Sequence, residues 1–373
     1  MKSGALTDLR EESFTFGRLA VITAISGLIG GAVAIVMVIL MFWLCNRSWV
    51  VDDAGSHGIS EVQSSRLGGV AIFFGIMVYA VAEWATSSPG ASQSILSSAE
   101  QFPGYWSFAL LIALVGLWDD FVTRFSPLAR LTLVFVISAI AMASGAVPMT
   151  PNAYDWLPWG LNNPIILTVA GTLIVTGFVN AGNMADGANG LLGIIGVSFL
   201  SVLLFYDHGS FSAFFIMALL IFVIFNVSTG RIFLGDFGAY GLSAMIGFGS
   251  LDLYAAGNVS LWFLGSLLAY PCIEMVRVIV ARTLQGASPL QASNDHLHNF
   301  LYDLLRKRGL NRIVANSSTG LFVGAITALL PASLVFSDVM DASATNLWGL
   351  YFGSYAALHL GFATRLKRAI YAK

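Results

Sequence analysis

The stretch FSAFFIMALLIFVIFNV, residues 211–227, decides what kind of protein this chain forms. It holds no charged side chain. A helix of this length, rising about 1.5 Å per residue, comes close to the thickness of the hydrocarbon core of a bilayer. The polar segment STGRIFLGDFG follows directly at 228–238. An uncharged run that ends in a polar segment predicts a transmembrane helix whose end meets water.

The rest of the chain has the same character. Its 373 residues are 57% hydrophobic and 10% charged, whereas soluble proteins carry about 25% charged residues. A β-barrel facing lipid would alternate apolar and polar side chains, which these runs do not do. We therefore expect an all-α, polytopic membrane protein, a single domain over residues 1–373 with about eleven transmembrane helices. The apolar runs lie near 19–45, 67–85, 106–118, 129–147, 164–180, 188–206, 211–227, 239–256, 260–282, 318–337 and 345–363.

The basic residues orient the chain. All but three of the 18 Lys and Arg residues fall on one side of the expected bilayer or at its edge, and the loops after the even-numbered helices contain none. By the positive-inside rule, the N-terminus lies outside and the C-terminus is cytoplasmic. The cytoplasmic loops are then expected near 46–66, 119–128, 181–190, 228–238 and 283–317. The net charge of −2 offers no basic field for nucleic acid.

Two neighbouring carboxylates end the third expected helix. Asp119 and Asp120 follow the apolar run 106–118. They stand at the negative end of the helix dipole, where carboxylates are unfavourable. A nearby positive charge should compensate them. The alternative is that the pair only solvates a helix end.

The fifth expected helix ends in Asn183-x-x-Asp186-Gly187-x-Asn189-Gly. Asn183 and Asp186 share one face of a helix because they are three residues apart. Gly187 permits a sharp turn and a close approach of the backbone to a ligand. An Asx-type turn between two helices would explain the same residues without a ligand.

Arg231 and Asp236 lie in the loop before the eighth expected helix. Asp is a favoured N-cap residue, so Asp236 taken alone is best explained as the cap of that helix. A helix N-terminus also attracts anions, and the two roles can coexist.

Further polar residues fall in the first and last cytoplasmic loops. Arg66 precedes the second helix, where a lone Arg usually anchors lipid headgroups. The last loop holds Arg282, His296 and His298, and two histidines without a Cys or carboxylate pattern are a weak zinc signal. The apolar side chains of residues 297–305 predict an amphipathic helix lying in the membrane surface.

Together these residues indicate one kind of chemistry. Oxygen-only acidic ligands select a hard cation such as Mg²⁺, for which Mn²⁺ is a substitute. The adjacent Arg side chains and a helix N-terminus suit a diphosphate. We therefore expect metal-assisted phosphoryl transfer between a soluble phosphate compound and a membrane component.

The same residues resemble the polyprenyl-phosphate N-acetylhexosamine-1-phosphate transferases (glycosyltransferase family 4), and more distantly phospho-MurNAc-pentapeptide translocase. The likeness runs in order from about Asp52 to His298. Its motifs are the Asp-Asp pair, Asn183-x-x-Asp186-Gly-x-Asn189-Gly-Leu, Phe-Leu-Gly-Asp236-x-Gly, and Gly286-x-Ser-Pro-x6-His296-Leu-His298. One such motif would be weak evidence, but four in order are strong.

The resemblance implies a reaction and a location. A sugar 1-phosphate, expected to be an N-acetylhexosamine 1-phosphate, passes from a UDP-sugar to undecaprenyl phosphate with release of UMP. This is the first membrane step of a cell-surface polysaccharide pathway. The protein would lie in the bacterial cytoplasmic (inner) membrane as a multi-pass enzyme with its active site facing the cytoplasm.

The resemblance also implies residue roles. Asp119 or Asp120 would deprotonate or position the lipid phosphate, or help hold the metal, and Asp236 would be the most direct magnesium ligand. Protonated histidines would make the stronger contact with the diphosphate. The expected substrate-binding residues are Arg66, Asn183, Asp186, Asn189, Arg231, Arg282, His296 and His298.

The sequence departs from the family pattern at a few positions. His57 stands where the family usually has Arg, Ser60 where it has His, and Asn299 where many members have a further His. These changes touch substrate recognition. They therefore affect which sugar we expect more than which reaction we expect.

The competing class is an ion-coupled membrane transporter. Such a protein needs polar groups near the middle of its helices and access from both faces. Glu83 and Glu274 are the main acids within or near the apolar runs, and the outer loops hold almost no ligand groups. This distribution favours the transferase. The sequence leaves open whether the protein acts as a homodimer.

Overall fold

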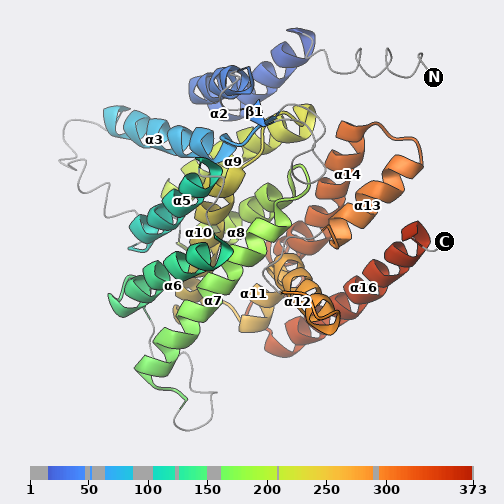
Figure 1. The fold of residues 1–373 in the computed structure, drawn as a ribbon. Helices are drawn as coiled ribbons and strands as arrows, with labels where there is room; N and C mark the ends of the chain where they lie inside the picture. The colour runs from blue at the N-terminus through green and yellow to red at the C-terminus, as the bar shows by residue number, and fades with distance from the viewer. Residues whose placement is uncertain are drawn as a thin grey trace.

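The structure is a computed structural model that describes residues 16–46, 51–52, 64–86, 104–121, 126–148, 161–207, 210–288 and 294–371. The described chain is helical, which confirms the all-α fold class (Figure 1). Each of the eleven apolar runs overlaps a helix or a bent helix pair. The helices are α2 (Phe16–Cys45), α3 (Gly68–Thr86), α5 (Trp106–Phe121), α6 (Pro127–Ala143), α7 (Pro164–Ala185), α8 (Leu191–Asp207), α9 (Ser210–Thr229), α10 (Gly235–Ala255), α11 (Leu261–Leu267), α12 (Ala269–Leu284), α13 (Leu297–Lys307), α14 (Arg312–Gly324), the π-helix η2 (Ala325–Leu329), α15 (Leu330–Phe336) and α16 (Thr345–Tyr371).

Several helices have the length and composition of membrane spans. Within the described residues, three are long and apolar enough to cross a bilayer, namely Pro164–Ala185, Phe211–Thr229 and Arg312–Phe336. A fourth is added if α11 and α12, bent by 78° to one another, form one broken span. These helices support a membrane protein. The total of eleven spans and the orientation of the termini stay predictions.

A short β-ladder of two-residue strands stands beside the helices. Strand β1 (Val51–Asp52) pairs with β2 (Ser64–Ser65) in antiparallel register. Ser65 also forms a parallel bridge to Ile232. The ladder continues toward α3, where the N–H groups of Gly68 and Gly69 donate to the carbonyls of Phe233 and Leu234 at 2.8 and 2.9 Å. These bonds satisfy backbone groups at the starts of two helices and fix the start of α3 against the start of α10.

Helix α10 lies at the centre of this part of the fold and packs against α3, α5 and α7. Glycines set how closely the helices approach one another. A Cβ at Gly69 would come within 2.3 Å of the Cα of Gly238, and one at Gly116 within 2.1 Å of the carbonyl oxygen of Asp236. Only glycine fits at such distances, so α3 and α5 contact α10 backbone to backbone.

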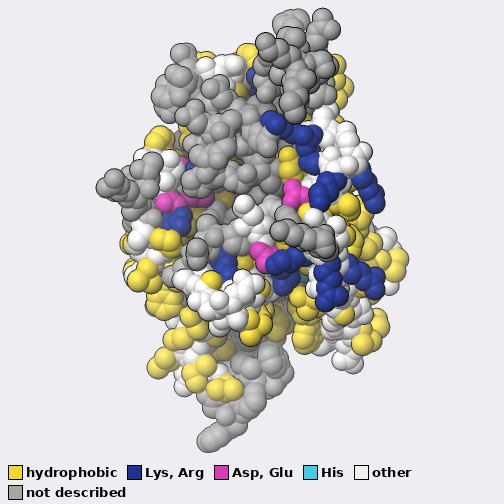
Figure 2. Space-filling model, turned by 45° about the vertical axis from the view of Figure 1, so that its right-hand side comes forward, with side chains coloured by type: hydrophobic (Ala, Val, Ile, Leu, Met, Phe, Trp, Pro, Cys, Tyr) yellow, Lys and Arg dark blue, Asp and Glu magenta, His cyan; other side chains and the backbone are white. Residues whose placement is uncertain are grey.

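Helix α13 corrects the prediction of a helix in the membrane surface. Its apolar side chains Leu297, Phe300 and Leu301 are buried, and the helix packs against α14 and α16. The amphipathic pattern is real, but protein rather than lipid covers the apolar face. Figure 2 shows Lys and Arg side chains gathered on the side of the molecule that carries α13, α14 and α16.

Substitution of Gly116 tests the close packing of α5 on α10. Gly116→Ala should lower the unfolding temperature by several degrees, because overpacking typically costs about 1–3 kcal/mol. Thermal unfolding in detergent measures the change. Gly353→Ala in α16 is the matched control, since nothing lies within 4 Å of its added Cβ. Equal unfolding temperatures for Gly116→Ala and the wild type would contradict a backbone contact between α5 and α10.

Candidate active site

The carboxylate of Asp120 caps α10 from another helix. Its Oδ1 accepts a hydrogen bond from the backbone N–H of Asp236, and its Oδ2 accepts one from the N–H of Phe237, both at 3.1 Å. The residue at the N-cap position, Leu234, supplies no side-chain bond. The interpretation of Asp236 as the cap is therefore wrong: Asp236 lies in the first turn, and Asp120 satisfies the free N–H groups. The positive end of the α10 dipole thus offsets the unfavourable place of Asp120 at the end of α5.

Arg130 is the positive charge that the Asp119–Asp120 pair requires. Its guanidinium forms an ion pair with the carboxylate of Asp119 and lies 3.8 Å from an oxygen of Asp236. In the sequence, Arg130 served only to orient the chain, and this role was missed. The available signal was its place in the first turn of the helix that follows Asp119 and Asp120 in the chain.

The carboxylates raise one another's pKa. Burial raises the pKa of Asp236 to about 8, helped by the carboxylates of Asp119 and Asp120. Burial raises the pKa of Asp120 to about 6, against the hydrogen bonds from α10 and the charge of Arg66. Burial and the charge of Asp120 also raise the pKa of Asp186 well above its ordinary range. Residues from the ends of α5 and α7 and the start of α10 therefore form one acidic cluster, as predicted.

Asp186 and Asn189 lie in the turn after α7, and their side chains interact with different parts of the protein. Asp186 faces the acidic cluster, as its interaction with Asp120 shows. Asn189 is 2% exposed and turns toward α14, where its side-chain amide donates to the Ser317 hydroxyl at 3.1 Å. Its backbone N–H donates to Asn316 at 2.9 Å. The Asn189 contacts hold the turn in place, and contact of Asn183 or Asn189 with a nucleotide stays a prediction.

His298 lies directly against this turn. A Cβ at Gly187 would fall 2.1 Å from Nε2 of His298, so Gly187 is needed for the ring to approach. The ring's Nδ1 shares a 2.7 Å hydrogen bond with the Tyr270 hydroxyl. Burial, followed by the neighbouring His296, lowers the pKa of His298 to about 3. Burial therefore favours the neutral ring in the protein alone, and a neutral ring offers one N–H.

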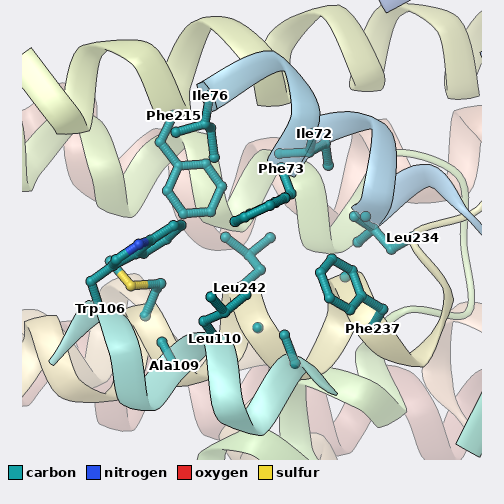
Figure 3. Close-up of a pocket in the computed structure, with 15 residues that line it drawn as sticks. Ile72, Phe73, Ile76, Trp106, Ala109, Leu110, Phe215, Leu234, Phe237 and Leu242 are labelled. Carbon is teal, nitrogen blue, oxygen red and sulfur yellow. The ribbon is translucent and has the colours of Figure 1, made fainter. Parts of the chain in front are cut away.

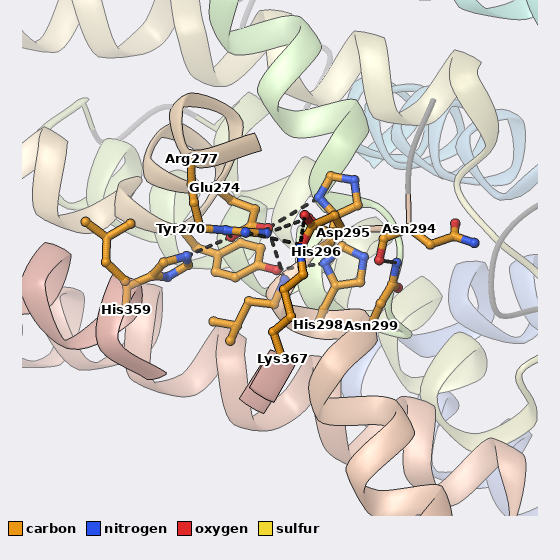
Figure 4. Close-up of polar contacts among 12 residues, drawn as sticks. Tyr270, Glu274, Arg277, Asn294, Asp295, His296, His298, Asn299, His359 and Lys367 are labelled. Atoms are coloured by element: carbon orange, nitrogen blue, oxygen red, sulfur yellow. Dashed lines mark hydrogen bonds and ion pairs between the residues drawn. The ribbon is translucent and has the colours of Figure 1, made fainter. Parts of the chain in front are cut away.

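His296 stacks on His298 with ring centroids 5.2 Å apart. Its Nδ1 lies 3.3 Å from the carboxylate of the buried Glu274 (Figure 4). Arg282 lies in the last turn of α12, before the segment that carries the histidines. Arg231 lies between α9 and α10, and its carbonyl accepts the N–H of Ser65 at 2.9 Å. The structure thus places Arg66 beside the carboxylates. His298 lies against the Asp186–Gly187 turn, and this turn connects the histidines with the carboxylates.

An apolar pocket adjoins the acidic cluster. Figure 3 shows Trp106 and Phe215 at one end, with Leu234 and Phe237 at the other. Phe237 directly follows Asp236, and its backbone N–H donates to Asp120, so this end of the pocket lies next to the carboxylates. Its wall comes from α3, α5, α9 and α10, and its lining residues are almost entirely apolar. Such a pocket suits the hydrocarbon part of a lipid better than a polar ligand.

The residues that the structure describes do not form a complete set of ligands for the expected metal. In the part of the chain that the structure describes, no three Asp, Glu, His or Cys side chains converge as metal ligands. The oxygens of Asp120 accept backbone N–H groups, and Asp119 pairs with Arg130. His57 and Ser60, where the sequence departs from the family pattern, lie outside the described residues.

Comparison with known proteins supports the motif resemblance. Residues 102–254 match the family described as Glycosyl transferase family 4. The chain is 26% identical to the decaprenyl-phosphate N-acetylglucosaminephosphotransferase of Mycolicibacterium smegmatis, over 83% of this chain and 82% of that protein. It is also 26% identical to the undecaprenyl-phosphate alpha-N-acetylglucosaminyl 1-phosphate transferase of Yersinia pestis, over 63% of this chain and 64% of that protein. A phospho-N-acetylmuramoyl-pentapeptide-transferase of Fervidobacterium nodosum is 29% identical over 34% of this chain and 42% of its own length.

These findings confirm the resemblance to the polyprenyl-phosphate N-acetylhexosamine-1-phosphate transferases. The matched segment holds all four carboxylates of the acidic cluster, Asp119, Asp120, Asp186 and Asp236. None of these three relatives is a transporter. The comparisons therefore agree with the chemistry that the carboxylates suggest.

The raised pKa of Asp236 predicts how stability depends on pH. The folded state holds this proton more tightly than the unfolded state, whose Asp has a pKa of 3.8. The resulting stabilisation is present below the unfolded pKa and is lost as the pH rises through about 8. In EDTA, the unfolding temperature should therefore fall as the pH is raised across this window.

Asp236→Asn should flatten this part of the profile and raise the unfolding temperature at alkaline pH. The matched control is Asp341→Asn, because the Ser343 N–H lowers the pKa of Asp341. It should leave the slope unchanged. Identical slopes for Asp236→Asn and the wild type would show that the Asp236 carboxylate is not crowded by its neighbours.

Proposed function

We propose that this protein transfers a sugar 1-phosphate from a UDP-sugar to undecaprenyl phosphate and releases UMP. The sugar is an N-acetylhexosamine, as in the relatives named above that act with N-acetylglucosamine phosphate. The single observation that carries the proposal is the acidic cluster beside an apolar pocket, within the segment that matches the transferase family. A reaction between a soluble phosphate and a lipid phosphate needs these two surroundings next to each other.

The reaction is a displacement at phosphorus. An oxygen of the lipid phosphate attacks the sugar-bearing phosphorus of the UDP-sugar, and the bond between the two phosphates of the donor breaks. UMP leaves with the bridging oxygen and its electron pair. Catalysis then consists of positioning the two phosphates and stabilising the charge that develops on their oxygens.

The hydrogen bonds and ion pairs of the carboxylates suggest different roles for them. Asp120 already accepts two backbone hydrogen bonds, so its main task is to hold the start of α10. Asp119 and Asp236 are left to meet the lipid phosphate and the metal. Arg130 and Arg66 lie close enough to offset the negative charge of the approaching phosphates.

The donor set fits Mg²⁺, or Mn²⁺ in its place. The groups are carboxylate oxygens without a thiolate, and burial with the neighbouring carboxylates raises the pKa of Asp236 and Asp120, so a divalent cation would stabilise their ionised forms. Asp236 would hold the ion, supported by Asp119. When bound, the ion neutralises charge on the diphosphate and on the leaving UMP.

The segment 294–298, which we call the histidine loop, would meet the diphosphate from the other side. His298 is neutral, so it contributes a neutral N–H donor rather than a positive charge. Asn183, Asp186 and Arg282 would line the nucleotide side of the site. In the bacterial inner membrane, with the C-terminus inside, all these residues would face the cytoplasm, where UDP-sugars are available.

The transporter alternative has no specific observation in its favour. Glu274, one of the two main acids within or near the apolar runs, has its carboxylate bound by Arg277 and His359. A carboxylate held in this way has a structural use that requires no ion pathway.

Replacement of Asp236 tests the proposal. With purified protein, polyprenyl phosphate and a panel of UDP-sugars, Asp236→Asn should lower transfer by about 10²–10³-fold, as loss of a preorganised charge contact does elsewhere. EDTA should abolish wild-type transfer, and added Mg²⁺ should restore it. Thin-layer separation of the lipid products measures each rate. Asp341→Asn serves as the control, and near-normal turnover of Asp236→Asn would remove this residue from the mechanism.

A further inference from the structure

The histidine loop is held by a buried carboxylate on α12. The side chain of Glu274 is 1% exposed. Its Oε1 accepts the guanidinium N–H of Arg277 at 2.6 Å and the backbone N–H of Leu297 at 3.0 Å. Its Oε2 lies 2.7 Å from Nε2 of His359. Figure 4 shows that these partners come from three separate elements, α12, the start of α13 and α16.

The bond between His359 and Glu274 has a defined direction. An ionised carboxylate only accepts hydrogen bonds, so Nε2 of His359 carries the proton and donates. Nδ1 of the ring shares a 3.1 Å hydrogen bond with the hydroxyl of Tyr355 on the same helix. The His359 side chain is fully buried, so its ring has no water to turn toward. Tyr355 and Glu274 together hold it in one orientation.

The same carboxylate fixes the backbone of the histidine loop. Leu297 lies between His296 and His298, so anchoring its N–H fixes the backbone from which both rings project. Oε1 of Glu274 is also 3.3 Å from Nδ1 of His296. A shift of Glu274 would therefore move both histidines away from the Asp186–Gly187 turn.

Helix α16 holds the loop at a second point. Lys367 donates to Oδ2 of Asp295 at 2.6 Å, and Arg277 reaches the other oxygen of Asp295 at 3.4 Å. The C-terminal helix thus contacts both the residue before the histidine motif and the carboxylate beneath it. These contacts lie far outside the matched segment 102–254.

We infer that His359 is a positioning residue for phosphosugar transfer: by donating to Oε2 of Glu274, it holds that carboxylate so that Oε1 fixes the histidine loop over the site. This inference rests on the proposed function. Without His359, Oε2 of Glu274 keeps only the longer 3.2 Å bond from Nε of Arg277, so the buried carboxylate moves toward Arg277. Misplacement of a catalytic group by about 1 Å can lower a rate about 10²-fold.

The experiment compares three variants in the transfer assay. His359→Ala should lower kcat/KM by about 10–10²-fold. His359→Gln should recover most of the loss, since its side-chain amide can still donate to Oε2. Tyr355→Phe leaves the Nε2 bond in place and removes only the second contact of the ring, so it should lose much less activity than His359→Ala. Thermal unfolding confirms that each variant is folded.

A double-mutant cycle separates positioning from general structural damage. If His359 acts through the loop, His359→Ala should reduce transfer much less in a His296→Ala background than in the wild type. An equal loss in both backgrounds, no recovery with His359→Gln, or wild-type rates for His359→Ala would each overturn the inference while leaving the proposed function intact. Absence of transfer by the wild type would instead refute the proposed function, and the inference with it.

Discussion

The site depends on one interaction, the acceptance of two α10 backbone N–H groups by the carboxylate of Asp120. It joins the negative end of α5 to the positive end of α10. Free N–H groups of α10 gain an acceptor, and the carboxylate gains a favourable helix dipole. The glycine contact between Gly116 and Asp236 brings the helices close enough for this bond. The backbone ladder from Ser65 to Leu234 then places Arg66 beside it. Asp119 and Asp236 meet only because these contacts hold.

The acidic cluster buries several carboxylates close together, which lowers the stability of the folded protein when they are ionised. Burial and mutual repulsion raise the pKa values of Asp120, Asp186 and Asp236 together, which is what a site prepared for a cation and two phosphates requires. At the histidine loop, by contrast, the Glu274 carboxylate is compensated by hydrogen bonds from Arg277, His359 and the backbone N–H of Leu297. The turn at Asp186 and Gly187 touches both groups and connects them.

Sequence reasoning found the parts of this site but not all of their roles. Apolar runs predicted the helices, and the distribution of basic residues predicted that the loops carrying Asp186 and the other carboxylates lie on the same side of the membrane. Local patterns failed where the partner was distant in the chain: Asp236 looked like a cap because the true cap, Asp120, lies more than a hundred residues earlier. The apolar face of α13 suggested lipid because α16 could not be placed from sequence. Arg130, Glu274 and His359 were missed as site residues for the same reason.

The most direct test of the central claim follows the donor's second phosphate. UDP-N-acetylglucosamine carrying ³²P in the phosphate next to the sugar is incubated with the purified protein, Mg²⁺ and undecaprenyl phosphate, and the lipid fraction is separated. Transfer of a sugar 1-phosphate predicts label in the lipid together with unlabelled UMP in the water phase. Sugar in the lipid with the ³²P left on a soluble nucleotide would mean that the sugar alone is transferred, and it would contradict a phosphosugar transferase.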